Sequence, residues 1–187
     1  MLSEINGRIS AMGFQIRRAK WPPSGNSPPP QLYLGFVNTE ADDSSKKASK
    51  YCTKDGKPDA RYAAFFRALL EKIATHPGDV DTGLGSVSLS DALNCKLTIP
   101  DASSQSQGQS QVQLQKDLAT FRASDRQAAL NQFVTDGWLS FDPSRGSVEG
   151  SRGYCLGPRS FLELPRVLED MEMQPLAKQA FEAAIFS

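Results

Sequence analysis

Few side chains of this sequence are suited to catalysis or metal binding. The chain has one histidine, His76, which stands beside Pro77, so a catalytic triad or dyad has no obvious general base. The three cysteines, Cys52, Cys95 and Cys155, lie far apart and form no Cys-x-x-Cys pair. Zinc sites are built from closely paired ligands, and an odd number of scattered cysteines is typical of reduced thiols. We therefore predict no catalytic residue, no metal site and no cofactor.

A second candidate for metal binding is the acidic turn at residues 78–83. Its sequence, Gly-Asp-Val-Asp-Thr-Gly, places two carboxylates close together. A calcium loop needs more oxygen ligands at a longer, regular spacing. The segment is predicted to be a plain turn, and no Gly-rich phosphate-binding loop of the Walker type occurs elsewhere.

The composition is that of a globular protein, without an excess of positive charge and without a membrane-spanning stretch. Of 187 residues, 39% are apolar and 22% are charged, with 21 basic and 21 acidic residues. A balanced charge offers no strong positive field for a phosphate backbone, so nucleic-acid binding would need a local patch. No apolar run approaches the roughly 20 residues that cross a bilayer. We expect an intracellular protein without a membrane partner.

The N-terminal 40 residues are predicted to form a helix and a hairpin. Leu2, Ile5 and Ile9 recur at helical spacing, and the helix should end at Gly13. Alternation at period two follows in residues 14–17 and again in residues 32–37, on either side of a proline-rich tip. This is the closing half of a winged helix. Because two helices normally precede that half, residues 1–40 are expected to be a truncated first winged helix.

The remainder of the chain predicts a second, complete winged helix over residues 59–171. Residues 41–58 are polar and are expected to be a solvated linker, and a Ser/Gln-rich insertion occupies residues 101–111. Helical periodicity begins at Asp59, a shorter helix is expected at residues 88–94, and a tail helix should begin at Pro175 within residues 172–187. The expected fold class is α+β, mainly helical, with tandem winged helices.

Local signals sharpen the limits of the later elements. Ser124 and Gln127 have the spacing of a capping box, and Gly137 should close the helix that the box opens. Residues 138–141 and 154–156 are predicted to pair as strands. Pro165 falls inside the helix that begins near Pro158, so we expect this helix to kink there.

Three segments together resemble one known family. Residues 130–139, followed by residues 153–164, are similar to the second winged helix of the non-structural-maintenance-of-chromosomes element 1 family. Residues 5–17 with 33–38 resemble the hairpin of that family's first winged helix, and residues 65–70 resemble the helix that follows. Order and approximate spacing agree over nearly the whole chain.

The resemblance implies a subunit of the SMC five/six chromosome complex that acts in the nucleus in DNA repair and recombination. Its implied partners are a MAGE-type winged-helix subunit and a kleisin, with DNA reached through the complex. Family members carry a zinc-binding RING that supports ubiquitin transfer. A RING needs about eight Cys and His ligands, and this sequence has four candidates, so we expect no RING here. Whether the sequence is full length, and whether it assembles without a RING, stays open.

Candidate partner-binding residues are apolar side chains of the truncated first domain, together with two from the helix that begins near Pro158. They are Leu2, Ile5, Ile9, Phe36, Phe161 and Leu164. A bare apolar stripe is rare on monomeric soluble proteins. The stripe of the first helix should therefore be covered, either by the chain's own C-terminal helix through Leu176, Phe181 and Ile185 or by another subunit.

The alternative function is that of a DNA-binding winged-helix protein of transcription-factor type. Arg145 and Arg152 in the predicted wing could contact phosphates. The helix in the reading position carries only Arg126 as a cation, although Asn131 and Gln132 could also meet bases.

Overall fold

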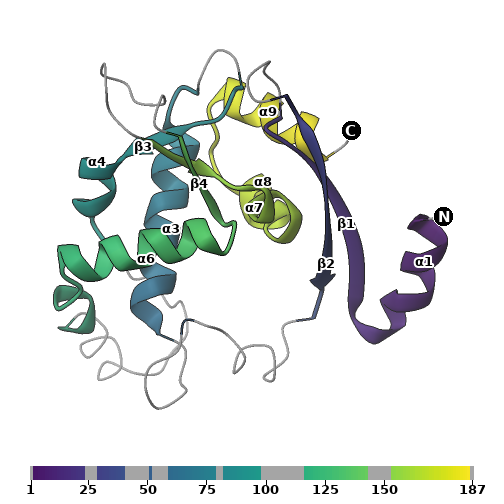
Figure 1. Cartoon of the computed structure of the whole chain (residues 1–187), viewed down its shortest axis with the longest axis horizontal. Coiled ribbons are helices and arrows are strands. Elements are labelled where there is room, and N and C mark those ends of the chain that lie inside the picture. The colour runs from purple at the N-terminus through teal and green to yellow at the C-terminus, as the bar shows by residue number, and fades with distance from the viewer. Residues whose placement is uncertain are drawn as a thin grey trace.

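The computed structural model describes residues 2–23, 29–40, 51, 59–78, 82–97, 116–142 and 153–185. Within them the fold is α+β, as expected (Figure 1). The strands are β1 (Phe14–Trp21), β2 (Gln31–Asn38), β3 (Ser86–Ser88), β4 (Leu139–Asp142) and β5 (Gly153–Leu156). The α-helices are α1 (Leu2–Ile9), α3 (Ala60–Thr75), α4 (Leu89–Leu93), α6 (Ala123–Thr135), α7 (Pro158–Glu163), α8 (Pro165–Glu169) and α9 (Pro175–Ile185). A short 3-10 helix, η1 (Ser10–Met12), follows α1.

A three-stranded antiparallel sheet in the order β3-β5-β4 lies against α3 and α6. The predicted strand pair is confirmed, with Leu139 opposite Leu156 and Phe141 opposite Tyr154. Strand β3 was not predicted; Val87 pairs with Tyr154 on the other side of β5. The expected helix at residues 88–94 is confirmed as α4, which Ser88 caps by accepting a hydrogen bond from the Asp91 amide.

Aromatic side chains form the centre of the core between α3 and α6. Phe65 is 0% exposed and Phe133 is 2% exposed. Phe121 packs edge-on against Phe65 with 5.6 Å between ring centroids, and Phe66 lies 5.0 Å from Phe133. Such offset and edge-to-face pairs add to the free energy already gained from burying the rings. This cluster joins the two helices on which the sheet rests.

Asp59 fixes the start of α3. Its carboxylate accepts a hydrogen bond from the Arg61 amide and forms an ion pair of 2.7 Å with the Arg61 guanidinium. The hydrogen bond from the Arg61 side chain lowers the pKa of Asp59, and this outweighs the opposing effect of burial. The predicted beginning of helicity at Asp59 is thus confirmed with Asp59 as the N-cap.

The start of α6 differs from the expectation. We predicted Ser124 as the cap and Gln127 as its partner, but Ala123 already begins the helix and Arg122 is the capping position. The Arg122 amide donates to the Asp125 carboxylate at 3.1 Å, so Asp125 takes the role that was expected of Gln127. Both pairs have the same three-residue spacing, and sequence spacing alone does not distinguish them. Gly137, with φ of 78°, follows the helix end as predicted.

The helix that we expected to kink at Pro165 instead ends before it, and a second helix begins there. Helix α7 ends at Glu163, Leu164 is non-helical, and α8 begins with Pro165 at its first position. Proline lacks an amide hydrogen and its ring would clash with the preceding turn, whereas the first helical position tolerates both properties. The tail helix predicted to begin at Pro175 is confirmed as α9.

The hairpin β1-β2 packs with one face on α7 and α9 (Figure 1). A Cβ atom at Gly35 would lie 2.9 Å from Cδ1 of Leu162, so α7 approaches the strand directly at this glycine. The Trp21 indole donates to the Leu156 carbonyl at 2.9 Å, and Arg17 donates to the Leu162 carbonyl. Because Ala19 is 1% exposed within the common core, the hairpin and the larger sheet share one apolar interior.

Tyr51 lies in the segment that was predicted to be a solvated linker, and this expectation is wrong at that position. Its ring stacks on Tyr62 and packs edge-on against Phe133. The hydroxyl donates to the Asp136 carboxylate at 2.7 Å. Burial, followed by this hydrogen bond, raises the pKa of Tyr51. The other residues of the predicted linker lie outside the described part of the chain.

Candidate protein-binding surface

The outer face of the hairpin is apolar along β2. Leu32, Leu34 and Phe36 are 63%, 61% and 64% exposed, and they alternate with Tyr33, Gly35 and Val37 on the face of β2 that packs against α7. Side chains two residues apart lie on one face of a strand. Three large apolar side chains in one exposed row form a continuous apolar patch, whereas apolar residues that are exposed singly do not. We call Leu32, Leu34 and Phe36 the β2 row.

Strand β1 places one apolar and two cationic side chains next to the β2 row. The register places Ile16 opposite Phe36, Arg18 opposite Leu34 and Lys20 opposite Leu32. Directly opposed residues of an antiparallel pair share a face, so these side chains lie beside the β2 row. Arg18 is exposed and Lys20 is partly exposed. The face therefore runs from an apolar end at Phe36 to a basic end at Lys20.

Aromatic stacking orients Phe36 at the apolar end. The Phe14 and Phe36 rings stack with their centroids 4.8 Å apart and an angle of 21° between the planes. Phe36 nevertheless remains 64% exposed, since Phe14 covers one side of the ring only. A ring that is held in place and exposed loses little conformational entropy when a partner covers it.

The Asn6 side chain connects α1 to the outer edge of β1. It makes the two backbone hydrogen bonds that a neighbouring strand would make. The Asn6 amide donates to the Ile16 carbonyl at 2.9 Å and its oxygen accepts from the Ile16 amide at 2.8 Å. The backbone of Ile16 therefore points away from β2. In an antiparallel ladder, the backbone of the residue opposite Ile16, which is Phe36, also points away from the partner strand. The Phe36 amide therefore points to the outer edge of β2. By alternation, the amides of Leu34 and Leu32 point to that edge as well.

The apolar stripe of α1 is left partly open by the described residues. No residue of α1 is buried; Ile5 is 38% exposed, and Leu2 and Ile9 are half-buried. We expected the C-terminal helix as one possible cover, and this alternative is wrong within the described chain. Helix α9 packs on β1 and α7, with Phe181 stacked on Phe161 at 6.2 Å, and Leu176 remains exposed. Figure 1 shows α1 on the far side of the hairpin from α9.

The structure places the six predicted partner-binding residues in two groups. Leu2, Ile5, Ile9 and Phe36 lie on the hairpin and its helix, as described above. Phe161, by contrast, is 2% exposed beneath α9 and is a core residue, so its availability to a partner was a wrong expectation. Leu164 is half-buried and lines two hollows beside α8, with volumes of about 440 and 320 Å³.

Sequence reasoning missed part of this surface. The alternation in residues 32–37 was recognised, but only Phe36 was named as a binding residue. Leu32 and Leu34, with Arg18 and Lys20 opposite them, complete the face. The period-two pattern shows which residues share a face, but which face is buried depends on α7 and α9, which lie more than 100 residues further along the chain.

Several polar side chains of α6 form hydrogen bonds within the chain. The Arg126 guanidinium donates to the carbonyls of Leu93, Cys95 and Phe121 at 2.7 to 3.1 Å. Gln127 donates to Asn131, and Gln132 donates to Asp136. A helix that reads DNA bases presents such groups to the major groove. Arg145 and Arg152, the predicted wing contacts, lie outside the described residues.

The described residues offer neither a metal site nor a membrane span. Among the described residues, no group of three or more His, Cys, Asp or Glu side chains is placed to hold a metal ion. Cys95 and Cys155 are buried, and burial raises the pKa of Cys95. No helix in the described part of the chain is long and apolar enough to cross a bilayer.

The fold and this surface define a protein-interaction subunit: a mixed helix-and-strand domain with a rigid, exposed apolar hairpin. The model of one family, described as the Nse1 non-SMC component of the SMC5-6 complex, matches residues 1–164. The chain belongs to this family. The resemblance inferred from the sequence is thereby confirmed.

A chain of the solved "Nse1-Nse3-Nse4 complex" has a similar structure, with a TM-score of 0.54 and 18% sequence identity. The match covers 90% of this chain and 55% of the solved chain, so this chain spans about half the length of that relative. At this identity the likeness concerns the fold. A search of curated proteins found no match.

Proposed function

We propose that this chain joins a MAGE-type winged-helix subunit to the SMC5-6 complex through the outer face of its hairpin, alongside a kleisin. Membership of the Nse1 family supports the complex, and the solved Nse1-Nse3-Nse4 assembly supports the pair of partners. The observation that carries the proposal is the β2 row, with three apolar side chains 61–64% exposed on a fixed strand. Through the complex the protein would act in the nucleus, in DNA repair and recombination.

The proposal includes a division into two winged helices. The order α3, β3, α4, α6, β4, β5 with the sheet β3-β5-β4 is the arrangement typical of a winged helix, and it supports one within residues 59–171. Residues 1–40 would be the closing half of another, with residues 41–58 as the connection and 172–187 as a C-terminal helical extension. The insertion at residues 101–111 lies outside the described residues.

The surface is proposed to act without a metal. Family members that carry a RING bind zinc in that RING and support ubiquitin transfer. The four Cys and His residues of this sequence cannot supply a RING. Elemental analysis of the purified, untagged chain should find less than one zinc per molecule. A stoichiometric, tightly held zinc ion would contradict this part of the proposal.

Direct reading of DNA by α6 is the weaker alternative, because its one cation, Arg126, already binds three carbonyls. The wing arginines provide the test of that mode. Replacing Arg145 and Arg152 with alanine should leave partner binding unchanged. Tight duplex binding that falls in this variant, in a salt-dependent manner, would favour the DNA-binding function.

The main experiment measures the affinity of the MAGE-type subunit, purified with its kleisin, for the double variant Leu34→Asp, Phe36→Asp. Burying two unpaired carboxylates in an apolar contact is strongly unfavourable, so the dissociation constant should rise well over tenfold. Leu176→Asp, at a site 44% exposed on α9, is the matched control and should bind normally. Circular dichroism and thermal unfolding verify the fold of each variant. Unchanged affinity in the folded double variant would refute the proposal.

A further inference from the structure

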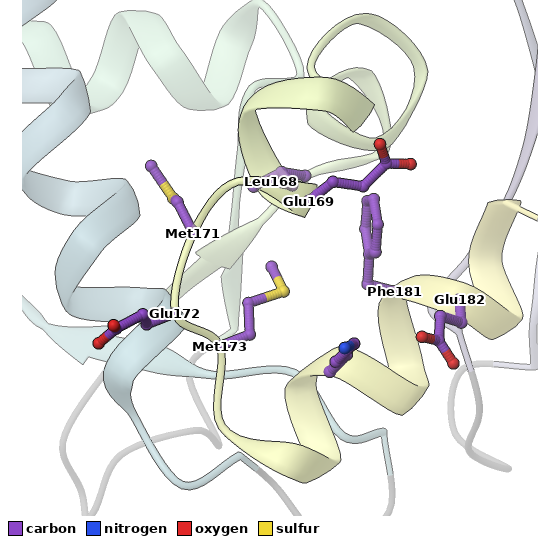
Figure 2. A pocket seen from close by; sticks show the side chains of 8 residues that line it. Leu168, Glu169, Met171, Glu172, Met173, Phe181 and Glu182 are labelled. Atoms are coloured by element: carbon purple, nitrogen blue, oxygen red, sulfur yellow. The ribbon is translucent and has the colours of Figure 1, made fainter.

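A further hollow lies between α8, the connection after it and α9 (Figure 2). Its volume is about 500 Å³, within the range of sites that bind ligands or anchoring side chains. The residues that line it are Leu168, Glu169, Met171, Glu172, Met173, Lys178, Phe181 and Glu182. We call it the α8-α9 groove. The hairpin face described above contributes no residue to it.

The floor of the groove is apolar and partly adaptable. Leu168 and Phe181 are 1% and 3% exposed and belong to the core, whereas Met171 and Met173 are half-buried at the wall. Methionine is unbranched and polarizable, and it fits apolar groups of different shape. A rigid base with flexible methionine walls is suited to an inserted apolar side chain.

Hydrogen bonds hold the wall of the groove in place. The Gln174 amide donates to the Ala74 carbonyl at the end of α3, and the Met173 amide donates to the Met171 carbonyl. At the two ends of this connection, the Asp170 amide donates to Arg166 and the Lys178 amide donates to Gln174. The groove is thus formed in the free chain, so little ordering is needed when a ligand enters.

The rim is acidic. Glu169, Glu172 and Glu182 are exposed, and no hydrogen bond or ion pair of theirs with another described residue is found. Lys178 is the single cation among the lining residues. Figure 2 shows Glu169 near the Phe181 ring and Glu182 beside Phe181 on α9, with Glu172 on the opposite side and its carboxylate directed outward. An apolar floor between carboxylates is complementary to an apolar side chain that has cations on both sides.

We propose that the α8-α9 groove binds a protein segment that inserts one large apolar side chain between flanking lysines or arginines. The apolar side chain would contact Leu168, Phe181 and the two methionines, and the cations would approach Glu169, Glu172 and Glu182. This site is separate from the hairpin face, so the chain would offer two docking surfaces of different charge. The basic end of the hairpin, at Arg18 and Lys20, would repel the cationic segment that the groove binds.

Three synthetic, fluorescein-labelled peptides test the proposal with the full chain by fluorescence anisotropy. The first has a central Phe flanked by two Lys on each side, the second has Glu in place of each Lys, and the third has Ser in place of Phe. Saturable binding of the first, with the other two at least tenfold weaker, is the expected result. Equal binding of the Ser peptide or the Glu peptide would overturn the proposal, and so would failure of the Phe-Lys peptide to bind.

Two charge-matched variants then locate the site. Glu169→Gln with Glu182→Gln should weaken the Phe-Lys peptide roughly fivefold, since exposed ion pairs contribute modestly. Glu4→Gln with Glu40→Gln removes the same charge from the hairpin end and should leave the affinity unchanged. Equal losses in both variants would show attraction by net charge alone and would refute the groove. The hairpin variant Leu34→Asp, Phe36→Asp should bind the peptide normally, so failure of one surface is distinguished from failure of the other.

Discussion

Helix α6 and the hairpin β1-β2 use their side chains in opposite ways. Along α6, Phe133 is buried in the aromatic core, and Arg126 and Gln132 bind acceptors within the chain. Along β2, every second residue from Leu32 to Phe36 is exposed and apolar. Side chains satisfied within the chain contribute to stability, whereas an exposed apolar row gains free energy only when another molecule covers it. The contrast separates the part of the fold that stabilises the chain from the part that we propose to bind a partner.

The largest expected effect is on stability, at the centre of the aromatic core. Phe133→Ala should lower the free energy of unfolding by about 3–5 kcal/mol, because a buried ring is replaced by a cavity. Phe36→Ala, at a ring 64% exposed, should lower it by less than about 1 kcal/mol. Urea unfolding followed by tryptophan fluorescence measures both. Similar losses in the two variants would break the contrast between core and surface.

The next effect concerns Arg126. Arg126→Met should reduce the free energy of unfolding by about 1–3 kcal/mol, because the carbonyls of Leu93, Cys95 and Phe121 lose their donor. Arg122→Met, an exposed neighbour that binds Asp125 through its backbone amide, is the control and should change it by less than about 0.5 kcal/mol. If Arg126→Met were as stable as the wild type, these hydrogen bonds would contribute little to folding. The Arg126 guanidinium of the wild type could then leave them to contact DNA.

A binding effect of more than tenfold, about 1.4 kcal/mol, is expected on α1. Ile5→Asp with Ile9→Asp places two charges in the stripe that the described residues leave partly open, and affinity for the MAGE-type subunit should fall accordingly. Ser3→Asp with Ser10→Asp adds the same charge at exposed polar positions and should have little effect. If both variants lose affinity equally, charge rather than the stripe is responsible.

The smallest effect is pH-dependent and belongs to Asp59. Since Arg61 lowers the pKa of Asp59 in the folded chain, the contribution is present above the unfolded pKa of about 3.9 and is lost as pH falls through the lower, folded pKa. Asp59→Asn keeps a capping side chain and removes the charge, and should cost about 1 kcal/mol at neutral pH. Unfolding at a series of pH values should show the two chains converging in acid. A constant difference would contradict the assignment.

Features that depend on residues close together in the sequence were predicted, and features that depend on residues far apart in the sequence were missed. The start of α3 at Asp59 and the β4-β5 pair follow from a cap and from alternation, and both were predicted. The break at Pro165 was also predicted, but as a kink, whereas one helix ends before the proline and another begins at it. Strand β3 has three residues and exists through its pairing with β5, about 65 residues later, so no local pattern marks it. Tyr51 and Phe161 were misplaced for the same reason: aromatic partners distant in sequence bury them.

The candidate surface shows the same limit. The helical stripe of α1 and the alternation of β2 were visible, but which side of the hairpin would be covered depends on α7 and α9. Helix α9 was considered as a cover for α1 and instead lies on β1, where Phe181 meets Phe161. The exposed face of β2 thus became identifiable only after the C-terminal helices were placed.

Hydrogen exchange measured by mass spectrometry, with and without the MAGE-type subunit, tests the docking of the hairpin face most directly. The amides of Leu32, Leu34 and Phe36 point to the free edge of β2 and should exchange quickly in the free chain. The complex should slow exchange in residues 31–38 and 2–9 and leave residues 123–135 of α6 unchanged. Protection confined to α6, with exchange in β2 and α1 as fast as in the free chain, would contradict the account.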